Sequence, residues 1–243
     1  MKKAIIIGAT SGMGLETAKL LHSKGWTIGA MGRRGDRLNA LANELKDRIF
    51  TKTVDITKED APLRLKDLIA EMEGVDLVFH VSGIGKQNLA LEPETELATV
   101  ATNAMGFTRM VTAAFNYFAS RGTGHIAVLS SIAGTKGLGA APSSSATKRF
   151  QTTYIQCLAQ QAKMRGLKIS FTDIRPGFVD TDLLSDGNSY PLLMQTNVVA
   201  RRIVKALERK ERKVVIDWRY AILVFFWRLI PDFIWERLPI KTK

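Results

Sequence analysis

Short apolar runs alternate along the chain with longer segments in which apolar residues recur every three or four positions. The short runs cover residues 3–8, 26–32, 49–56, 75–83, 124–134 and 167–177. The longer segments cover residues 14–25, 35–47, 59–73, 143–165 and a stretch that ends near residue 120. This alternation predicts strand–helix–strand units. Because runs such as "AIII" at residues 4–7 are apolar throughout, we expect parallel strands buried on both faces of an α/β fold.

The pattern loosens after Gly177. Residues 182–195 are rich in Ser, Asp, Gly, Asn and Pro and predict a loop. A helix is expected at 196–209, a strand at 213–216 and an amphipathic tail at 217–243. The sequence contains no internal repeat, low-complexity tract or linker, so we expect one domain over residues 1–243.

Composition and charge narrow the class of protein. Apolar residues make up 46% of the chain and charged residues 24%, which is typical of a globular domain. A single cysteine suits a reducing compartment, and glycines interrupt the first apolar run too early for a signal peptide, so we expect a cytoplasmic protein. The net charge is +12, and the chain from Arg201 onward has 12 Lys and Arg against 5 Asp and Glu, a net +7. Such an excess attracts nucleic acid, anionic lipid or a phosphorylated ligand without choosing among them.

The motif "GATSGMG" follows the first predicted strand and opens a helix. Its glycines, Gly8, Gly12 and Gly14, let the backbone approach a diphosphate at a helix N-terminus, although a plain glycine-rich turn has the same pattern. Arg33 and Arg34 follow the second strand, where an acidic residue binds a free ribose 2′-hydroxyl and an arginine suits a 2′-phosphate. We therefore expect NADP(H) rather than NAD(H). The alternative is a solvated pair of surface arginines.

Further motifs follow in a fixed order. "VDIT" supplies Asp55 after the third strand, and "TNAMG" supplies Asn103. "SSIAG" includes Ser131, and "RPGFVDT" covers residues 175–181. Thirteen residues beyond Ser131 stands Ser144, and four residues further stands Lys148.

This series resembles the short-chain dehydrogenase/reductase family over about residues 3–182. The resemblance implies a Rossmann-type, doubly wound parallel sheet of about seven strands in three layers, here followed by a C-terminal helical tail. It also implies a homodimer or homotetramer. The catalytic positions it implies are Asn103, Ser131, Ser144 and Lys148. The cofactor-binding positions are Gly8, Thr10, Ser11, Gly12, Met13, Gly14, Arg33, Arg34, Asp55, Ile56, Gly83, Asn103, Lys148, Pro176, Gly177, Val179 and Thr181.

The chain departs from the family pattern at two places. The family has Tyr-x-x-x-Lys where this chain has Ser144 and Lys148, and it has Asn-Asn-Ala-Gly where this chain has "HVSG", with His80 and Val81 in place of the asparagines. A phenol beside an ammonium can protonate the oxygen of a carbonyl that accepts hydride. The Ser144 hydroxyl has a far higher pKa than a phenol and a shorter side chain, so we expect a loss of about 10²–10⁴-fold in activity. An engineered exchange and a natural loss of activity both explain the serine.

The resemblance thus implies an NADP(H)-dependent oxidoreductase that interconverts a ketone and a secondary alcohol and is impaired at Ser144. We expect a hydrophobic, lipid-like substrate because the tail is rich in large apolar residues. The alternative is a non-catalytic nucleotide-sensing or scaffold protein on the same fold.

The tail places Trp218, Trp227 and Trp235 among arginines. Its longest uncharged run, residues 220–227, is far shorter than the roughly 20 residues that span a bilayer. Two interpretations remain open: a helix that lies at a membrane interface, or a helix pair packed over the substrate cleft or against another subunit. Nucleic-acid binding is not favoured, since large aliphatic residues interrupt the charges and no recognised module is present.

The remaining candidates suggest structural roles. Cys157 is expected to be a buried small apolar side chain, and His22 and His125 are expected at the surface or at a strand edge. His80 lies near the expected cofactor loop. No group of residues has the spacing of metal ligands, so we expect no metal.

Overall fold

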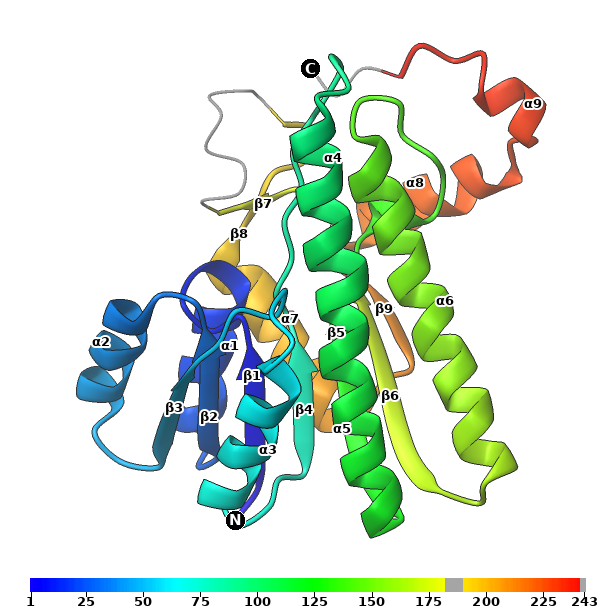
Figure 1. The fold of residues 1–243 in the computed structure, drawn as a ribbon. Coiled ribbons are helices and arrows are strands. Elements are labelled where there is room, and N and C mark those ends of the chain that lie inside the picture. The colour runs from blue at the N-terminus through cyan, green and yellow to red at the C-terminus, as the bar shows by residue number, and fades with distance from the viewer. Residues whose placement is uncertain (182–189, 241–243) are drawn as a thin grey trace.

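A computed structural model describes residues 1–181 and 190–240. Its centre is a seven-stranded sheet with the order β3-β2-β1-β4-β5-β6-β9, in which all neighbouring strands are parallel (Figure 1). The strands are β1 Lys3–Ile7, β2 Thr27–Gly32, β3 Ile49–Thr53, β4 Leu77–His80, β5 Thr123–Leu129, β6 Lys168–Arg175 and β9 Lys213–Val215. The strand order reverses between β1 and β4. In doubly wound sheets, ligands bind at such a switch point, outside the carboxyl ends of the strands.

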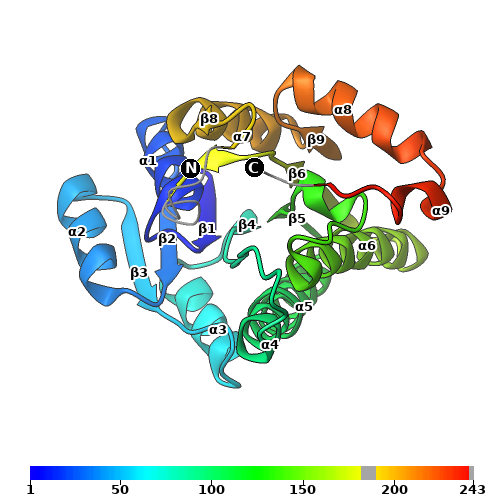
Figure 2. The ribbon, with the colours of Figure 1, turned by 90° about the horizontal axis from the view of Figure 1, so that it is seen from above.

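Helices cover both faces of the sheet and make three layers, as predicted (Figure 2). One face carries α1 Gly12–Ser23, α2 Gly35–Leu45 and α7 Thr196–Arg209; the other carries α3 Ala61–Glu71, α5 Phe107–Arg121 and α6 Pro142–Met164. The alternation of side chains along β1 explains its apolar run. The core between the sheet and α1, α2 and α7, which we call the first core, contains Ala4 and Ile6. The second core, between the sheet and α3, α5 and α6, contains Ile5 and Ile7.

The helical stretch before residue 120 is divided into three parts. α4 Pro93–Val100 leads into a π-helical turn, Ala101–Gly106, and then into α5. At Gly106, a Cβ would lie 2.8 Å from Ile56 Cγ1, so only glycine lets this turn approach the segment after β3. π-helical turns are common at functional sites, and this one contains the buried Asn103.

The chain after β6 differs in part from the prediction. A short strand, β7 Val179–Asp180, pairs with β8 Met194–Gln195, at the end of the segment that the sequence predicts as a loop. The rest of that segment, residues 182–189, lies outside the described residues. The tail forms α8 Trp218–Leu229 and α9 Asp232–Trp235. Within residues 1–181 and 190–240, none of the helices combines the length and apolar character that a bilayer crossing requires.

Two of the structural expectations are wrong. Cys157 is exposed because it lies off the buried stripe of α6, which includes Ile155, Leu158 and Ala162. His125 is buried because β5 is an interior strand, and its Nε2 pairs with Thr172 Oγ1 at 2.8 Å.

Candidate cofactor and active site

The loop between β1 and α1, residues 8–14, forms a tight bend that we call the glycine turn. Gly8 (φ +105°) and Gly12 (φ +53°) adopt left-handed backbone conformations that L side chains rarely adopt. A Cβ on Gly14 would overlap the carbonyl oxygen of Gly8. Met13 packs against the first core and fixes the helix start. Because α1 begins at Gly12, its first N–H groups open onto this turn.

Arg34 follows β2 and reaches back to the glycine turn. Its Nη2 donates to Thr10 Oγ1 (3.0 Å) and Ser11 Oγ (2.6 Å), and its Nε donates to Thr10 Oγ1 (3.2 Å). Gly32 permits this approach, since a Cβ there would lie 2.5 Å from Thr10 Cγ2. Arg33 beside it is exposed. Two guanidinium groups and two hydroxyl groups therefore border the turn, a set of donors that suits a phosphate.

Asp55 and Ile56 follow β3 at the same edge of the sheet. Asp55 Oδ1 accepts hydrogen bonds from Thr57 N (3.0 Å) and Thr57 Oγ1 (2.7 Å). Partial burial opposes ionisation of Asp55, but these two bonds and the charge of Arg33 hold its carboxyl pKa below the usual range. Ile56 is buried against Gly106. The carboxylate is thus fixed by Thr57 and charged near Arg33.

Lys148 lies on α6 and turns its ammonium toward the carboxyl end of β5. Its Nζ donates to Leu129 O (2.9 Å) and Gln151 Oε1 (3.2 Å). Burial lowers the Lys148 pKa to about 8, and the charge of Asp173 only partly offsets this effect. A Cβ on Gly83 would lie 3.3 Å from Nζ, so the loop after β4 contacts the ammonium closely.

Asn103 joins the loop after β4 to α6. Its Oδ1 accepts from Ile84 N (2.9 Å), and its Nδ2 donates to Ile84 O (2.7 Å) and Thr147 Oγ1 (3.2 Å). The Asn103 main-chain oxygen accepts from Gln151 Nε2 (2.9 Å). The fully buried Gln151 amide therefore links Lys148 to the Asn103 carbonyl. Gln151 is not among the residues predicted from the sequence, although its position three residues after Lys148 places it on the same helix face.

The two serines of the expected catalytic set lie on different elements. Ser131 follows β5; its Oγ donates to Pro176 O (3.4 Å) and accepts from Ala133 N (3.1 Å). Ser144 lies in the first turn of α6, and a Cβ on Gly85 would lie 2.7 Å from its Oγ. We use the name reactive centre for the four positions expected to be catalytic, Asn103, Ser131, Ser144 and Lys148.

A buried ion pair on β6 lies near the reactive centre. Arg175 Nε donates to Asp173 Oδ2 (2.7 Å), and the Ser130 hydroxyl donates to Asp173 Oδ1. Asp173 is 1% exposed, and its negative charge raises the pKa of Lys148 against the effect of burial. This pair was not predicted from the sequence: a spacing of two residues places Asp173 and Arg175 on the same face of β6, but only the packing shows that both are buried.

His80 is the last residue of β4. It is 1% exposed, its ring packs edge-on against Phe107 at 5.2 Å between centroids, and its Nε2 has no hydrogen-bond partner among the described residues. Burial, and to a smaller extent the charge of Lys148, lower the His80 pKa to about 3. The ring is therefore neutral near pH 7.

The segment after β6 contacts both the glycine turn and the tail. A Cβ on Gly177 would overlap the ring of Tyr220, so α8 packs directly on this backbone. Val179 is buried within β7. Thr181 reaches the glycine turn, where its Cγ2 lies 3.2 Å from a Cβ built on Gly12.

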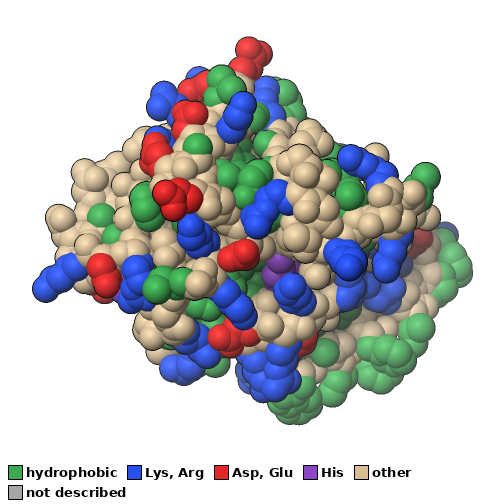
Figure 3. Space-filling view, turned by 90° about the horizontal axis from the view of Figure 1, so that it is seen from below, with side chains coloured by type: hydrophobic (Ala, Val, Ile, Leu, Met, Phe, Trp, Pro, Cys, Tyr) green, Lys and Arg blue, Asp and Glu red, His purple; other side chains and the backbone are tan. Residues whose placement is uncertain are grey.

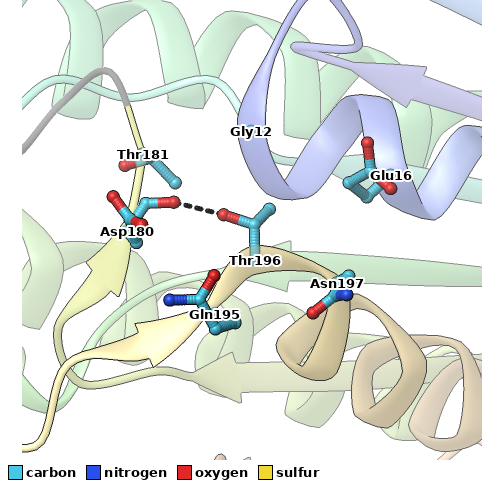
Figure 4. A pocket seen from close by; sticks show the side chains of 7 residues that line it. All are labelled: Gly12, Glu16, Asp180, Thr181, Gln195, Thr196 and Asn197. Carbon is cyan, nitrogen blue, oxygen red and sulfur yellow. Dashed lines mark hydrogen bonds between the residues drawn. The ribbon is translucent and has the colours of Figure 1, made fainter.

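An open pocket of about 470 Å³ lies between α1 and the β7–β8 pair (Figure 4). Its lining residues are Gly12, Glu16, Asp180, Thr181, Gln195, Thr196 and Asn197. The Thr196 hydroxyl donates to Asp180 O and joins the first residue of α7 to β7. This pocket borders the glycine turn and does not include the reactive centre.

Comparison with known proteins agrees with this geometry. The family model for short chain dehydrogenase matches residues 2–190. A protein of Myxococcus xanthus, named an uncharacterized oxidoreductase, is 32% identical over 238 residues, which cover 95% of this chain and 93% of that protein. The chain belongs to the short-chain dehydrogenase family of oxidoreductases.

Solved structures share the fold of this short-chain dehydrogenase. An alcohol dehydrogenase from Thermococcus sibiricus superposes with a TM-score of 0.79 at 22% identity, covering 89% of this chain and 96% of that one. A 3-ketoacyl-(acyl-carrier-protein) reductase from Brucella melitensis superposes with a TM-score of 0.77 at 22% identity, covering 89% and 96%. At this level of identity the likeness concerns the fold.

Proposed function

We propose that this short-chain dehydrogenase binds NADP(H) and interconverts a hydrophobic ketone and its secondary alcohol, with proton transfer impaired at Ser144. One observation carries the proposal: Gly83, Asn103 and Lys148 meet at the carboxyl edge of the sheet, and the Lys148 pKa is lowered to about 8. Perturbed pKa values gather at functional sites. The exposed apolar tail beside this edge supports a hydrophobic substrate.

The proposal of a dinucleotide rests on the glycine turn and the arginine pair. The Thermococcus structure is a complex with 5-hydroxy-NADP and the Brucella structure a complex with NADH, which supports a nicotinamide cofactor. The N–H groups at the start of α1 would hold the diphosphate, and Arg33 and Arg34 would hold a 2′-phosphate. When bound, the cofactor supplies or accepts the hydride.

The reactive centre would act on the carbonyl oxygen. The Lys148 ammonium still carries its proton near pH 7, so its charge stabilises negative charge that develops on that oxygen. The Ser131 hydroxyl would donate a hydrogen bond to the same atom. Ser144, one helical turn before Lys148, stands where the family has its tyrosine, and an aliphatic hydroxyl is too weak an acid for this role. We therefore expect turnover to be reduced by about 10²–10⁴-fold.

Restoring the phenol tests the proposal directly. We expect Ser144→Tyr to raise NADPH oxidation with long-chain ketones by about 10²-fold or more. The matched control is Ser144→Phe, which adds the same ring near Gly85 without the hydroxyl and should gain nothing. Titration of the unmodified chain with NADPH and NADH tests binding separately. Absence of any binding would refute the proposal.

One observation favours a second candidate, a nucleotide-sensing or scaffold protein. Ser144 stands in place of the family's tyrosine and His80 in place of the first asparagine of its Asn-Asn-Ala-Gly stretch, whereas the glycine turn is intact. This candidate predicts NADPH binding without a gain in turnover for Ser144→Tyr. The proposed oxidoreductase predicts NADPH binding together with a gain in turnover for Ser144→Tyr.

A further inference from the structure

The helix α8 is apolar on two opposite faces. Tyr220 and Val224 are buried against the body of the protein. Successive residues of an α-helix are rotated by about 100°, so residues separated by three or four positions lie on one face. The face opposite Tyr220 and Val224 contains four such residues. These outward residues are Trp218 (72% exposed), Ile222 (48%), Phe225 (62%) and Leu229 (65%). A helix with apolar residues all round is normally covered on both sides.

The exposed surface continues beyond this face. Phe226, Phe233 and Leu238 are also large, apolar and exposed. We call the outward residues of α8 together with these three the tail patch. Figure 3 shows an apolar patch at the lower right, on the side where Figure 2 places α8, with Lys and Arg side chains nearby. Contiguous apolar patches of this kind mark sites of interaction with proteins or membranes.

Hydrogen bonds fix the tail patch to the body of the protein. Lys136 Nζ donates to Ile230 O (2.9 Å), and Trp235 Nε1 donates to Gly137 O (2.6 Å). On the other side, the Tyr220 hydroxyl donates to Pro191 O (2.7 Å). The patch is thus a fixed surface, tied to the loop that follows Ser131 and to the chain that precedes β8.

Charge distinguishes between occupants of this surface. α8 contains Arg219 and Arg228 and no acidic residue, and on the helical wheel these arginines flank the apolar face on opposite sides. Arg219 is paired with Asp217, whereas the charge of Arg228 acts on Lys213. The Lys213 pKa is lowered, first by the charge of Arg175, then by burial, and further by Arg228 and Arg212. Asp173 opposes this shift. The border of the patch near Arg228 and Lys213 is therefore positive, whereas Asp232 and Glu236 lie at the α9 end of the patch.

A second copy of the chain fits this surface poorly. In a two-fold contact the same patch meets itself, and α8 of a second copy contains no acidic residue that could pair with Arg228. A bilayer with anionic headgroups has the complementary arrangement. Its acyl region receives Trp, Phe and Leu side chains, and its phosphates attract the flanking cations.

We propose that the tail patch docks this protein on the surface of an anionic lipid bilayer, with the apolar face of α8 inserted at the interface. Docking goes beyond the proposed oxidoreductase function and does not depend on it. The patch lies at the end of the molecule where the sheet strands terminate (Figure 1). Docking would therefore hold the reactive centre close to the lipid.

Vesicle flotation with the full chain tests the proposal. We expect binding to phosphatidylcholine vesicles that contain phosphatidylglycerol, and weaker binding to phosphatidylcholine alone. Replacing two exposed rings by Phe225→Ser and Phe226→Ser should raise the lipid concentration for half-binding about 10- to 100-fold. Arg228→Glu should weaken binding to the anionic vesicles only.

The matched control removes two exposed apolar side chains elsewhere, by Leu63→Ser and Met164→Ser, and should leave flotation unchanged. Thermal unfolding of each variant verifies that it folds. The proposal is overturned if the unmodified chain does not float with anionic vesicles, or if the Phe225→Ser, Phe226→Ser variant floats equally well. It is also overturned if the chain forms a dimer that does not bind vesicles and if the Phe225→Ser, Phe226→Ser variant is a monomer. NADPH titration reports separately on the oxidoreductase proposal.

Discussion

The glycine turn and the reactive centre lie at the same edge of the sheet, but they depend on the sequence in different ways. In the turn, the shape of the backbone is decisive: Gly8 and Gly12 have positive φ, and Gly14 has no space for a side chain. In the reactive centre, the side chains are decisive. Lys148, Gln151 and the Asn103 carbonyl form a continuous hydrogen-bonded chain, and Ser144 stands beside it with a short hydroxyl.

This contrast implies that binding and chemistry are separable in this chain. The exchange of one side chain at residue 144 leaves the backbone of the glycine turn as it is. The lysine network likewise reaches Asn103 through Gln151 without using Ser144. We therefore expect a protein that retains its affinity for a dinucleotide while its turnover is low.

The largest effect is expected in the glycine turn. Gly14→Ala places a Cβ on the carbonyl oxygen of Gly8, so β1 and α1 must separate. We expect the free energy of unfolding to fall by about 3 kcal/mol or more, with loss of NADPH binding. Gly139→Ala is the matched control, because a Cβ there has no atom within 4 Å. Denaturant unfolding and fluorescence titration measure both effects, and equal behaviour of the two variants would contradict the proposed role of the turn.

The sequence predicts the glycine turn better than the reactive centre for a physical reason. Positive φ and close backbone approach demand glycine, so the spacing of Gly8, Gly12 and Gly14 is visible in the sequence. The link through Gln151 arises from tertiary packing, and no short motif distinguishes a buried amide from an exposed one. The same applies to the β7–β8 pairing, which joins two-residue strands separated by residues 181–193. The parallel sheet was predictable because strands buried on both faces are apolar throughout.

The second prediction concerns the pH dependence of stability. In the folded chain the Lys148 pKa is about 8, against 10.5 for an ordinary lysine. Between these values the unfolded chain binds a proton that the folded chain has released, so folding becomes more favourable as pH rises from about 8 to 10.5. Relative to Lys148→Met, the unmodified chain should gain about 2–3 kcal/mol across this window. Denaturant unfolding at several pH values measures the difference.

Gln151→Glu makes this prediction more specific. A carboxylate in place of the amide that accepts from Lys148 Nζ should raise the lysine pKa, so the window should begin at a higher pH. Lys66→Met is the control for Lys148→Met, because it also removes one positive charge but lies on the exposed side of α3. If the unmodified chain and Lys148→Met had parallel pH profiles, the Lys148 ammonium would be fully hydrated and the proposed centre would lack its electrostatic basis.

The smallest expected effect is a change in the affinity for NADPH relative to the affinity for NADH. Arg34→Ala removes the guanidinium that bonds Thr10 and Ser11, and with it a charged donor for a 2′-phosphate. We expect the Kd for NADPH to rise about tenfold, since a charged hydrogen bond of this kind contributes about 1.5 kcal/mol. The Kd for NADH should change far less, because NADH lacks that phosphate. Arg64→Ala, on the exposed side of α3, controls for the change in net charge. An equal loss for both cofactors would mean that Arg34 shapes the glycine turn rather than selecting the phosphate.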